Sequence, residues 1–258
     1  METFGICLLS TIPVRCKPAE RSEMGSQLLF GETYQVIDEQ ENWVKIQCTW
    51  DKYTGWIRNN QLEEIEKNEL EEMQEVLAFA LETSQPAVGR EFYIPILMGS
   101  TMPQFDGINF RVKGQRFTYS GQAIQPNNTK PSTQLAVRIA RKYLYAPFFW
   151  GGRSPFGVDA AGLIQVVYKM MGVKMSRSAA MQAKRGKTIH FVDNAQEGDL
   201  AFFENERNKI IHVGMVLAES EIIHAAGRVR VDMLDHYGIF NTETNHYTHK
   251  LRLIKRIL

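Results

Sequence analysis

The chain has 258 residues, of which 44% are hydrophobic and 23% charged, and its formal net charge is +1. This length exceeds that of a typical single domain, so we expect two or three compact units. The balanced charge gives no electrostatic preference for nucleic acid or for a membrane surface, and it excludes neither small molecules nor proteins as partners. We therefore expect no nucleic-acid or membrane partner, and the sequence leaves the oligomeric state open.

The first residues show no basic leader, and turn-forming residues interrupt their apolar run, which argues against a signal peptide or a membrane anchor. We expect a cytoplasmic protein, with a periplasmic one as the alternative if a signal was removed before the first residue. The cysteines match no metal-ligand spacing and are expected to be buried or spare thiols: Cys7, Cys16 and Cys48.

Residues 1–65 consist of short β-prone runs separated by turn residues, a rhythm typical of a small barrel. The runs PVRCKPAE, SQLLFGETYQVIDEQENWVKI and YTGWI follow one another in this segment. Their order resembles a bacterial SH3 domain, in which a turn-rich arm precedes a hairpin and a closing Gly-Trp-Ile strand.

Residues 66–128 are predicted to form a second unit. The acidic stretch at residues 62–74 predicts a short connecting helix or a solvated linker. Gly-Ser, Asp-Gly and Lys-Gly pairs then mark hairpin turns, which indicates a second, divergent SH3-like barrel. The polar stretch QPNNTKPS at residues 125–132 is a natural boundary.

Residues 129–258 change to helices followed by strands, which predicts an α+β domain. A helix should begin with Ser132 or Thr133 as its cap, and a second helix should run from Ala160 to Gly172. The later runs LAFFE, IHVGMVLAES, EIIHAAG and VRVDML are strand candidates.

The run APFFWGGRSPFGVDAAGLIQ brings a small residue, Ala160, to the first turn of that second helix. Unpaired backbone N–H groups and the positive end of the helix dipole would stabilise a thiolate at this position. An alanine has no group to ionise, so the position can hold no nucleophile in this chain.

Four ordered motifs in this half resemble the NlpC family of cysteine peptidases. Trp150-Gly151-Gly152 precedes Asp159-Ala160-Ala161-Gly162, where the family has Asp-Cys-Ser-Gly or Asp-Cys-Ala-Gly. A Gly-Asp-Leu strand opener and two histidine-bearing strands follow downstream. An ordered set of this kind is far more specific than any single motif. The resemblance implies a papain-like NlpC catalytic domain preceded by the two SH3-like barrels.

In that family, the histidine at His212 would act as general base toward the thiol, and His224 would orient its ring. The remaining histidines match no motif and are expected at the surface or in turns: His190, His236, His246 and His249. A zinc site from His212, His224 and Asp159 is conceivable, yet neither the spacing nor the cysteine content supports it. We therefore expect no metal and no cofactor.

The resemblance also implies a substrate, namely a murein tripeptide or related cell-wall peptide that carries a free N-terminal L-alanine and is cut at its γ-D-glutamyl-L-diamino acid bond. Tyr53 lies where such enzymes place a substrate-contacting tyrosine. Glu23 could pair with the substrate ammonium, or it could be a solvated surface charge. The other expected binding residues are Trp150, Asp159 and Ser178.

Three residues depart from the family pattern. Ala160 replaces the nucleophile, Phe148 stands where relatives often have tyrosine, and Ser178 where they often have aspartate. The first departure predicts a peptidase that is inactive as written. It has two possible origins, an engineered substitution or a natural loss that leaves a pseudoenzyme able to bind cell-wall peptides or a protein partner. Another interpretation is a scaffold whose SH3-like units bind a protein partner. The sequence does not distinguish lysine from diaminopimelate preference.

Overall fold

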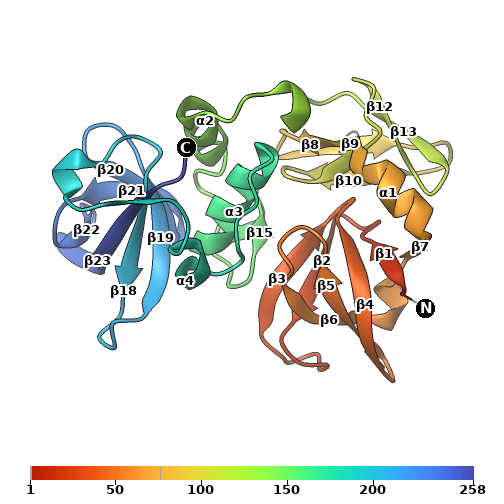
Figure 1. The fold of residues 1–258 in the computed structure, drawn as a ribbon, viewed down its shortest axis with the longest axis horizontal. Helices are drawn as coiled ribbons and strands as arrows, with labels where there is room; N and C mark the ends of the chain where they lie inside the picture. The colour runs from red at the N-terminus through yellow and green to blue at the C-terminus, as the bar shows by residue number, and fades with distance from the viewer. Residues whose placement is uncertain (1, 76) are drawn as a thin grey trace.

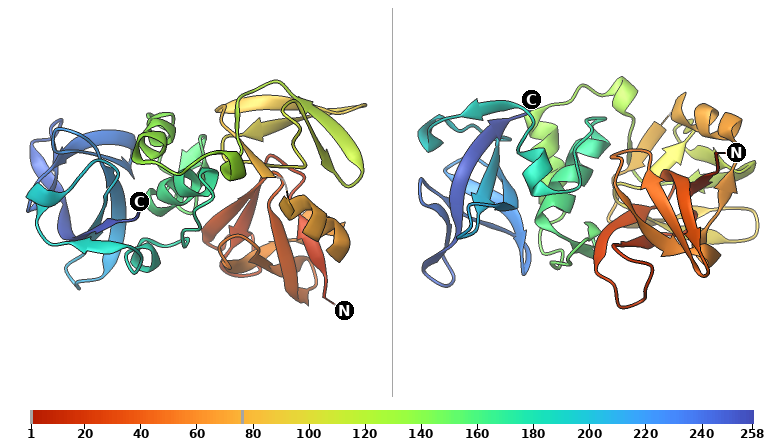
Figure 2. Two further views of the ribbon diagram at one scale, coloured as in Figure 1. Left: turned by 45° about the horizontal axis from the view of Figure 1, so that its top comes forward. Right: turned by 60° about the horizontal axis from the view of Figure 1, so that its bottom comes forward.

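The computed structural model describes residues 2–75 and 77–258 and consists mostly of β-sheet with few helices. Figure 1 shows its parts side by side: an N-terminal sheet and a smaller unit above it at one end, a group of helices in the middle, and a C-terminal sheet at the other end. The two further views in Figure 2 keep the helices between the N-terminal and C-terminal sheets.

The N-terminal sheet has seven strands in the order β3-β2-β6-β5-β4-β1-β7, and all its pairings are antiparallel. Alternating residues such as Tyr34, Ile46 and Ile57 point into one core, as half-buried strands require. Its elements are β1 (Phe4–Ile6), β2 (Thr11–Arg15), β3 (Met24–Leu29), β4 (Thr33–Gln40), β5 (Trp43–Cys48), β6 (Thr54–Arg58), the 3-10 turn η1 (Asn59–Gln61) and β7 (Glu64–Ile65).

The connecting helix α1 (Lys67–Glu75) is shorter than the stretch expected from the sequence. The start predicted at residue 62 is wrong, because Glu64 and Ile65 pair with β1 and extend the N-terminal sheet. Helix formation begins only after this pairing ends. Leu70 and Met73 of this helix are buried and pack into the core of the unit that follows.

The middle unit contains a four-stranded sheet, β10-β9-β13-β12, and a three-stranded sheet, β11-β8-β14. Its core also includes Ile6 and Phe30, so the N-terminal sheet and this unit share apolar packing. The Lys113–Gly114 turn between β12 and β13 has positive φ at both residues, as a two-residue hairpin requires. Its elements are β8 (Leu77–Ala80), β9 (Ser84–Val88), β10 (Tyr93–Leu97), β11 (Thr101–Pro103), β12 (Asn109–Val112), β13 (Gln115–Tyr119), β14 (Ala123–Ile124) and the 3-10 turn η2 (Pro126–Asn128).

The C-terminal part has helices followed by a seven-stranded sheet in the order β17-β23-β18-β19-β20-β21-β22, and β22 also pairs with β23. Its strands are β15 (Arg153–Ser154), β16 (Gly157–Val158), β17 (Lys187–Ile189), β18 (Leu200–Glu204), β19 (Ile210–Val216), β20 (Glu221–Ala226), β21 (Arg228–Leu234), β22 (Gly238–Asn241) and β23 (His246–Arg256), and η3 (Val192–Asn194) is a 3-10 turn.

Three α-helices lie beside this sheet: α2 (Thr133–Arg141), α3 (Ala160–Met170) and α4 (Ala179–Gln182). The Ser132 hydroxyl accepts a hydrogen bond from the backbone N–H of Leu135, which confirms the predicted cap of α2. Gly172 follows the end of α3 with a φ of +75°, a left-handed conformation that glycine adopts without strain.

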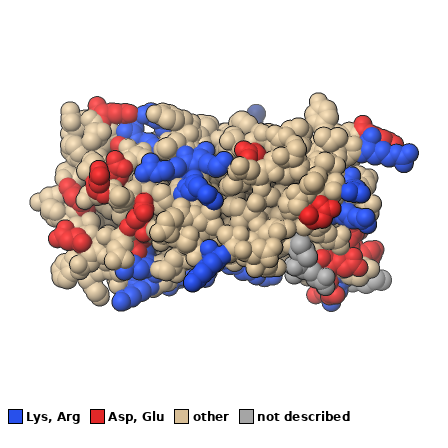
Figure 3. All heavy atoms as spheres, turned by 90° about the horizontal axis from the view of Figure 1, so that it is seen from above, with Lys and Arg blue, Asp and Glu red and all other residues tan. Residues whose placement is uncertain are grey.

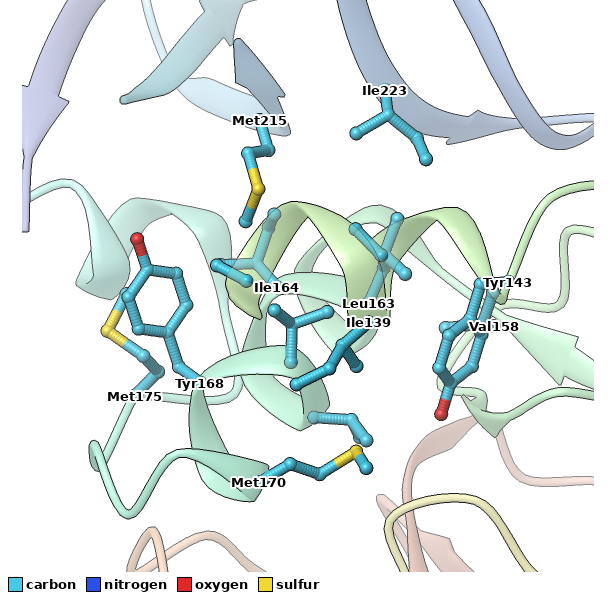
Figure 4. Packing of buried hydrophobic residues seen from close by; sticks show 14 of the residues in the cluster. Ile139, Tyr143, Val158, Leu163, Ile164, Tyr168, Met170, Met175, Met215 and Ile223 are labelled. Carbon is cyan, nitrogen blue, oxygen red and sulfur yellow. The ribbon is translucent and has the colours of Figure 1, made fainter. Parts of the chain in front are cut away.

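Every residue of α3 is buried, because one of its faces packs on the C-terminal sheet and the other faces the N-terminal half. Figure 4 shows Leu163 and Ile164 of this helix near Met215 and Ile223 of the sheet. Apolar residues on both faces are expected of a helix that is enclosed on all sides, and the one charged residue of α3, Lys169, is ion-paired. The N-terminus of α3 is thereby held rigidly at the junction of the two halves.

A buried ion cluster joins the halves. Glu32, next to β4, binds the Arg153 guanidinium at 2.7 and 2.8 Å and the Lys169 ammonium at 2.5 Å. Lys169 also donates to the carbonyl oxygen of Gly99 in the middle unit. Burial alone would raise the pKa of Glu32, but the two cations outweigh it and lower that pKa to about 2.

Acidic and basic side chains both occur on the face seen in Figure 3, and neither sign covers it. This agrees with the balanced composition. Within the described part of the chain, no helix is long and apolar enough to cross a membrane.

Candidate active site

A cleft of about 530 Å³ lies where the N-terminal sheet meets the C-terminal part. Its lining comes from the loops around Cys16, Glu23 and Tyr53, the loop at residues 148–150, the start of α3, the start of α4, and strands β19, β20 and β23. We use three names for its sides. The helix wall is Ala160, Ala161, Ala179 and Ala180; the histidine wall is His212 and His249; the barrel wall is Cys16, Glu23 and Tyr53.

The helix wall begins with Ala160, the first residue of α3, which is only 6% exposed. Asp159 is the N-cap, and its Oδ1 accepts a hydrogen bond from the N–H of Gly162 at 2.7 Å. The geometry predicted for a thiolate-stabilising helix N-terminus is therefore present. The Ala160 side chain supplies only a methyl group to it.

The Asp159 carboxylate is fully engaged by protein groups. Besides Gly162, it accepts from the N–H of Gly151 at 2.9 Å and from both terminal nitrogens of Arg177, at 3.0 and 2.6 Å. A bidentate pair with arginine is among the stronger ion pairs in proteins. Asp159 thus fixes the glycine-rich loop and α3 to one another, and it is not available as the metal ligand considered from the sequence.

A chain of hydrogen bonds runs inward from the histidine wall. His212 Nε2 lies 2.9 Å from His224 Nδ1, and His224 Nε2 lies 2.9 Å from Asp232 Oδ2. Arg230 binds both carboxylate oxygens of Asp232, at 2.9 and 2.7 Å. A carboxylate can only accept, so His224 carries its proton on Nε2. In the neutral pair, His224 Nδ1 then accepts from His212 Nε2–H, which leaves His212 Nδ1 with a free lone pair.

Burial and neighbouring groups keep this chain of hydrogen-bonded side chains in that protonation state. Burial, reinforced by His249 and His224, holds the pKa of His212 well below its usual range. Burial would raise the pKa of Asp232, but hydrogen bonds from His224 and Arg230 lower it. Near neutral pH, His212 is therefore an uncharged imidazole and Asp232 an anion.

His249 overturns one expectation, because it is neither a free surface residue nor a turn residue. It lies on β23, lines the cleft, and stacks on His212 with ring centroids 4.0 Å apart. Burial first and His224 second lower the pKa of His249 to about 4. The remaining unmatched histidines, His190, His236 and His246, are exposed, as expected.

The barrel wall carries the residues predicted to contact a substrate. Tyr53 is half-buried there, with its hydroxyl 3.9 Å from the thiol of Cys16, and burial raises its pKa. The Glu23 carboxylate accepts a hydrogen bond from the indole N–H of Trp150 at 2.5 Å. This bond crosses from the N-terminal sheet to the loop before α3, so the carboxylate is oriented by the opposite side of the cleft.

The two lesser departures from the family pattern also lie in the cleft. Phe148 is 36% exposed, and Ser178 caps the short helix α4 without a side-chain hydrogen bond to it.

Of the three cysteines, Cys7 and Cys48 are buried and only Cys16 is exposed.

The residues singled out from the sequence as site residues all line the cleft except His224. This histidine lies behind His212 and is hydrogen-bonded to it. Sequence reasoning missed Asp232, His249 and Arg177. A signal existed for Asp232, which is the acidic residue in the strand run VRVDML. Arg177 directly precedes Ser178, but nothing in its sequence position indicates a pair with Asp159.

Comparisons with known proteins find matches in both the C-terminal and the N-terminal part of the chain. The NlpC/P60 family model matches residues 145–251, and the model of the bacterial dipeptidyl-peptidase SH3 domain matches residues 14–62. The chain is 29% identical over 219 residues to the gamma-D-glutamyl-L-lysine dipeptidyl-peptidase of Bacillus subtilis (strain 168), covering 78% of this chain and 71% of that protein.

Two further relatives extend the match. Dipeptidyl-peptidase 6 of Lysinibacillus sphaericus is 25% identical over 243 residues, which cover 85% of this chain and 87% of that protein. The crystal structure of an NlpC/P60 family protein from Bacillus cereus ATCC 10987 superposes with a TM-score of 0.85 over 100% of both chains at 19% identity, which shows the same fold. The chain therefore combines an NlpC/P60-family domain with a bacterial dipeptidyl-peptidase SH3 domain.

Proposed function

We propose that this chain binds murein peptides with a free N-terminal L-alanine, in the manner of a γ-D-glutamyl-L-diamino acid endopeptidase, and does not hydrolyse them because Ala160 offers no nucleophile. The observation that carries the proposal is the composition of the cleft. Tyr53 and Glu23, from loops that join strands of the N-terminal sheet, line the same cleft as Ala160 and His212. Two relatives that span most of the chain are named as dipeptidyl-peptidases, which supports the same substrate class.

In this proposal, Glu23 pairs with the substrate ammonium. Trp150 donates to Glu23 Oε1, and the second carboxylate oxygen, Oε2, would accept from the substrate ammonium. A charge-assisted hydrogen bond of this kind contributes about 1.5 to 3 kcal/mol. Tyr53 supplies the wall that stops a longer peptide from passing through the cleft.

The intact hydrogen-bond chain supports a second candidate, namely a peptidase complete except for its thiol. His212 Nδ1 would accept the proton of a thiol at position 160 and return it to the leaving amine, while His224 and Asp232 hold the imidazole in the required tautomer. This candidate and the pseudoenzyme share one binding mode. They differ in whether a cysteine at position 160 is enough for turnover.

We also propose the division of the chain into an SH3-like barrel at 1–65, a second, divergent SH3-like barrel at 66–128, and a papain-like α+β domain at 129–258. The middle unit's two small sheets around Phe110 and Phe117 support the second barrel. The buried helix α3 packed on a sheet supports the papain-like domain.

Calorimetry on the unmodified chain tests the binding proposal. L-Ala-γ-D-Glu-L-Lys should bind ten to a hundred or more times more tightly than its N-acetylated form, since acetylation removes the ammonium. Tyr53→Ala should weaken binding of the free peptide, whereas Tyr93→Ala, an exposed tyrosine on β10, should not. Equal affinity for the free and acetylated peptides would rule out recognition of the amino terminus.

A further inference from the structure

His249 lines the cleft beside His212, yet the hydrogen-bond chain from His212 to Asp232 does not include it. Its ring stacks on the ring of His212, with centroids 4.0 Å apart and an angle of 25° between the ring planes. The Nδ1 of His249 lies 2.8 Å from the hydroxyl oxygen of Thr248, so this nitrogen already has a partner in the protein. What His249 offers to His212 is therefore the flat face of its ring.

Two β-bulges lie directly beside the stacked rings. In β19 the extra residue is Ile211, just before His212, and in β23 it is Thr248, just before His249. A bulge leaves one residue unpaired and re-aims the neighbouring side chain, and bulges are frequent next to active sites. Because β18 separates β19 from β23, two strand spacings of roughly 9 to 10 Å lie between their backbones. The rings nevertheless meet, so both side chains lean toward each other across β18.

The backbone of His249 is held in place by its neighbours. On β22, a Cβ added at Gly238 would overlap the carbonyl oxygen of His249, so a larger residue there would push the two strands apart. On β18, the fully buried ring of Phe203 lies 5.8 Å from the His212 ring and 6.0 Å from the His249 ring, centroid to centroid. His249 thus presents its ring from a fixed position.

The His212 ring needs a support of this kind. Its Nε2 hydrogen bond to His224 fixes one ring atom, but the ring can still tilt about that bond. A second ring stacked on its face opposes the tilt, and aromatic pairs of this kind are favourable in proteins. The stacked ring also covers His212 from water, which agrees with burial as the first cause and His249 as the second cause of its low pKa.

We propose that His249 is a positioning residue that fixes the ring plane of His212 by stacking and so keeps His212 Nδ1 aimed at the residue at position 160. The role requires a flat ring at position 249 and no proton transfer by it. The pKa of His249, about 4, leaves its ring uncharged near neutral pH. The effect on turnover rests on the peptidase candidate of the proposed function, whereas the ring geometry does not.

Nitrogen-15 NMR of the unmodified chain tests the geometry without catalysis. His249→Ala should uncover one face of His212 and raise its pKa toward the ordinary range, whereas His249→Phe, which keeps a flat ring, should leave that pKa low. An unchanged titration of His212 in a folded His249→Ala protein would overturn the proposal. The other titratable groups of the histidine chain and the cleft wall are the same in all three proteins: His224, Asp232, Arg230, Asp159 and Arg177.

Kinetics in the Ala160→Cys background test the consequence for turnover. His249→Ala should lower kcat about ten- to a hundredfold and leave KM nearly unchanged, since a misplaced base affects the chemical step and not binding. His249→Phe should restore most of the lost rate. His246→Ala, an exposed histidine on the same strand, is the matched control and should behave like its parent. A His249→Phe protein as slow as His249→Ala would overturn positioning by stacking, because the reaction would then need a nitrogen of His249.

Alkylation of the Ala160→Cys thiol by iodoacetamide gives a readout that needs no peptide. His249→Ala should shift the pH profile of alkylation to higher pH, because a poorly placed imidazole stabilises the thiolate less, and His249→Phe should not. A shifted profile in a protein that cleaves no peptide would refute the proposed hydrolysis and support the positioning role.

Cleavage that His249→Ala leaves unchanged in both kcat and the alkylation profile would refute the positioning role and support the hydrolysis. Circular dichroism checks the fold of each variant. His249→Leu fills the same space without a flat ring, and it replaces His249→Ala if alanine impairs folding.

Discussion

The helix wall and the histidine wall line the same cleft, yet they present different functional groups to it. The helix wall presents only the methyl groups of Ala160, Ala161, Ala179 and Ala180. Behind the histidine wall, by contrast, lies a continuous chain of hydrogen bonds from His212 to Asp232. In the proposed function, the groups that would transfer protons remain organised although the group that they would activate is absent, since their positions depend on the sheet and not on the residue at position 160.

Restoring a thiol to the helix wall should produce the largest effect. Ala160→Cys should hydrolyse L-Ala-γ-D-Glu-L-Lys or its diaminopimelate counterpart at least about 10⁴ times faster than the unmodified chain, because a nucleophile is regained beside an intact base. Mass spectrometry would detect the released L-Ala-D-Glu dipeptide.

Ala180→Cys is the matched control for that experiment, because it places a thiol in the same cleft away from the N-terminus of α3. It should alkylate more slowly than Ala160→Cys and should not hydrolyse the peptide. A folded Ala160→Cys protein that is inert toward a panel of such peptides would exclude the incomplete peptidase and leave the binding protein.

The two walls can cooperate only while the halves of the molecule stay docked, which depends on the buried ion cluster. Glu32→Gln leaves Arg153 and Lys169 as uncompensated buried cations, so we expect a loss of about 3 to 5 kcal/mol in the free energy of unfolding. Glu20→Gln breaks an exposed pair with Arg58 and should cost less than about 1 kcal/mol. Urea denaturation would measure both.

Glu32→Gln should also change how the free energy of unfolding depends on pH in the acid range. The folded-state pKa of Glu32, about 2, lies below its ordinary value of 4.5, so the unfolded chain binds more protons between these values. Its contribution to stability is complete above pH 4.5 and is lost as the pH falls through 2. The unmodified protein should therefore lose about 3 kcal/mol more than Glu32→Gln between pH 5 and pH 2. Parallel losses in both proteins would contradict the role of the cluster.

A smaller effect should follow from breaking the histidine chain at its inner end. An asparagine at position 232 can present an N–H to His224 and so favour the wrong tautomer. In the Ala160→Cys background, Asp232→Asn should lower kcat/KM about a hundredfold, with Asp193→Asn, an exposed aspartate, as the control. Nitrogen-15 NMR of His224 should show the proton moving from Nε2 to Nδ1. An unchanged tautomer of His224 would show that Asp232 does not determine which nitrogen of His224 carries the proton.

The sequence predicted local structure best where a sequence motif also marks the start of a helix or strand. Asp159 and Ala160 were expected at the start of a helix, and α3 begins there. Asp232 was within reach of the same reasoning. A hairpin turning at Gly227 pairs His224 with Arg230, which puts Asp232 diagonally across from His224 on the same face.

His249 could not have been found in this way. Its place beside His212 depends on β23 pairing with both β18 and β22, and on a bulge where Phe202 pairs with Leu253 but Phe203 with Leu251. Neither the strand order nor the bulge leaves a sign in the residues around position 249. The ion cluster was missed for the same reason, since its three members are brought together only by the docking of separate units.

Gly151 has a consequence for how such proteins can be assembled from parts. It has a φ of +78°, and a Cβ added there would lie 2.1 Å from the carbonyl oxygen of Met24 in the N-terminal sheet. The second residue of the Trp-Gly-Gly motif is therefore a contact surface for the barrel as well as part of the approach to α3. Exchanging this barrel for another would require a donor whose backbone passes equally close to Gly151, so the two parts are not freely interchangeable modules.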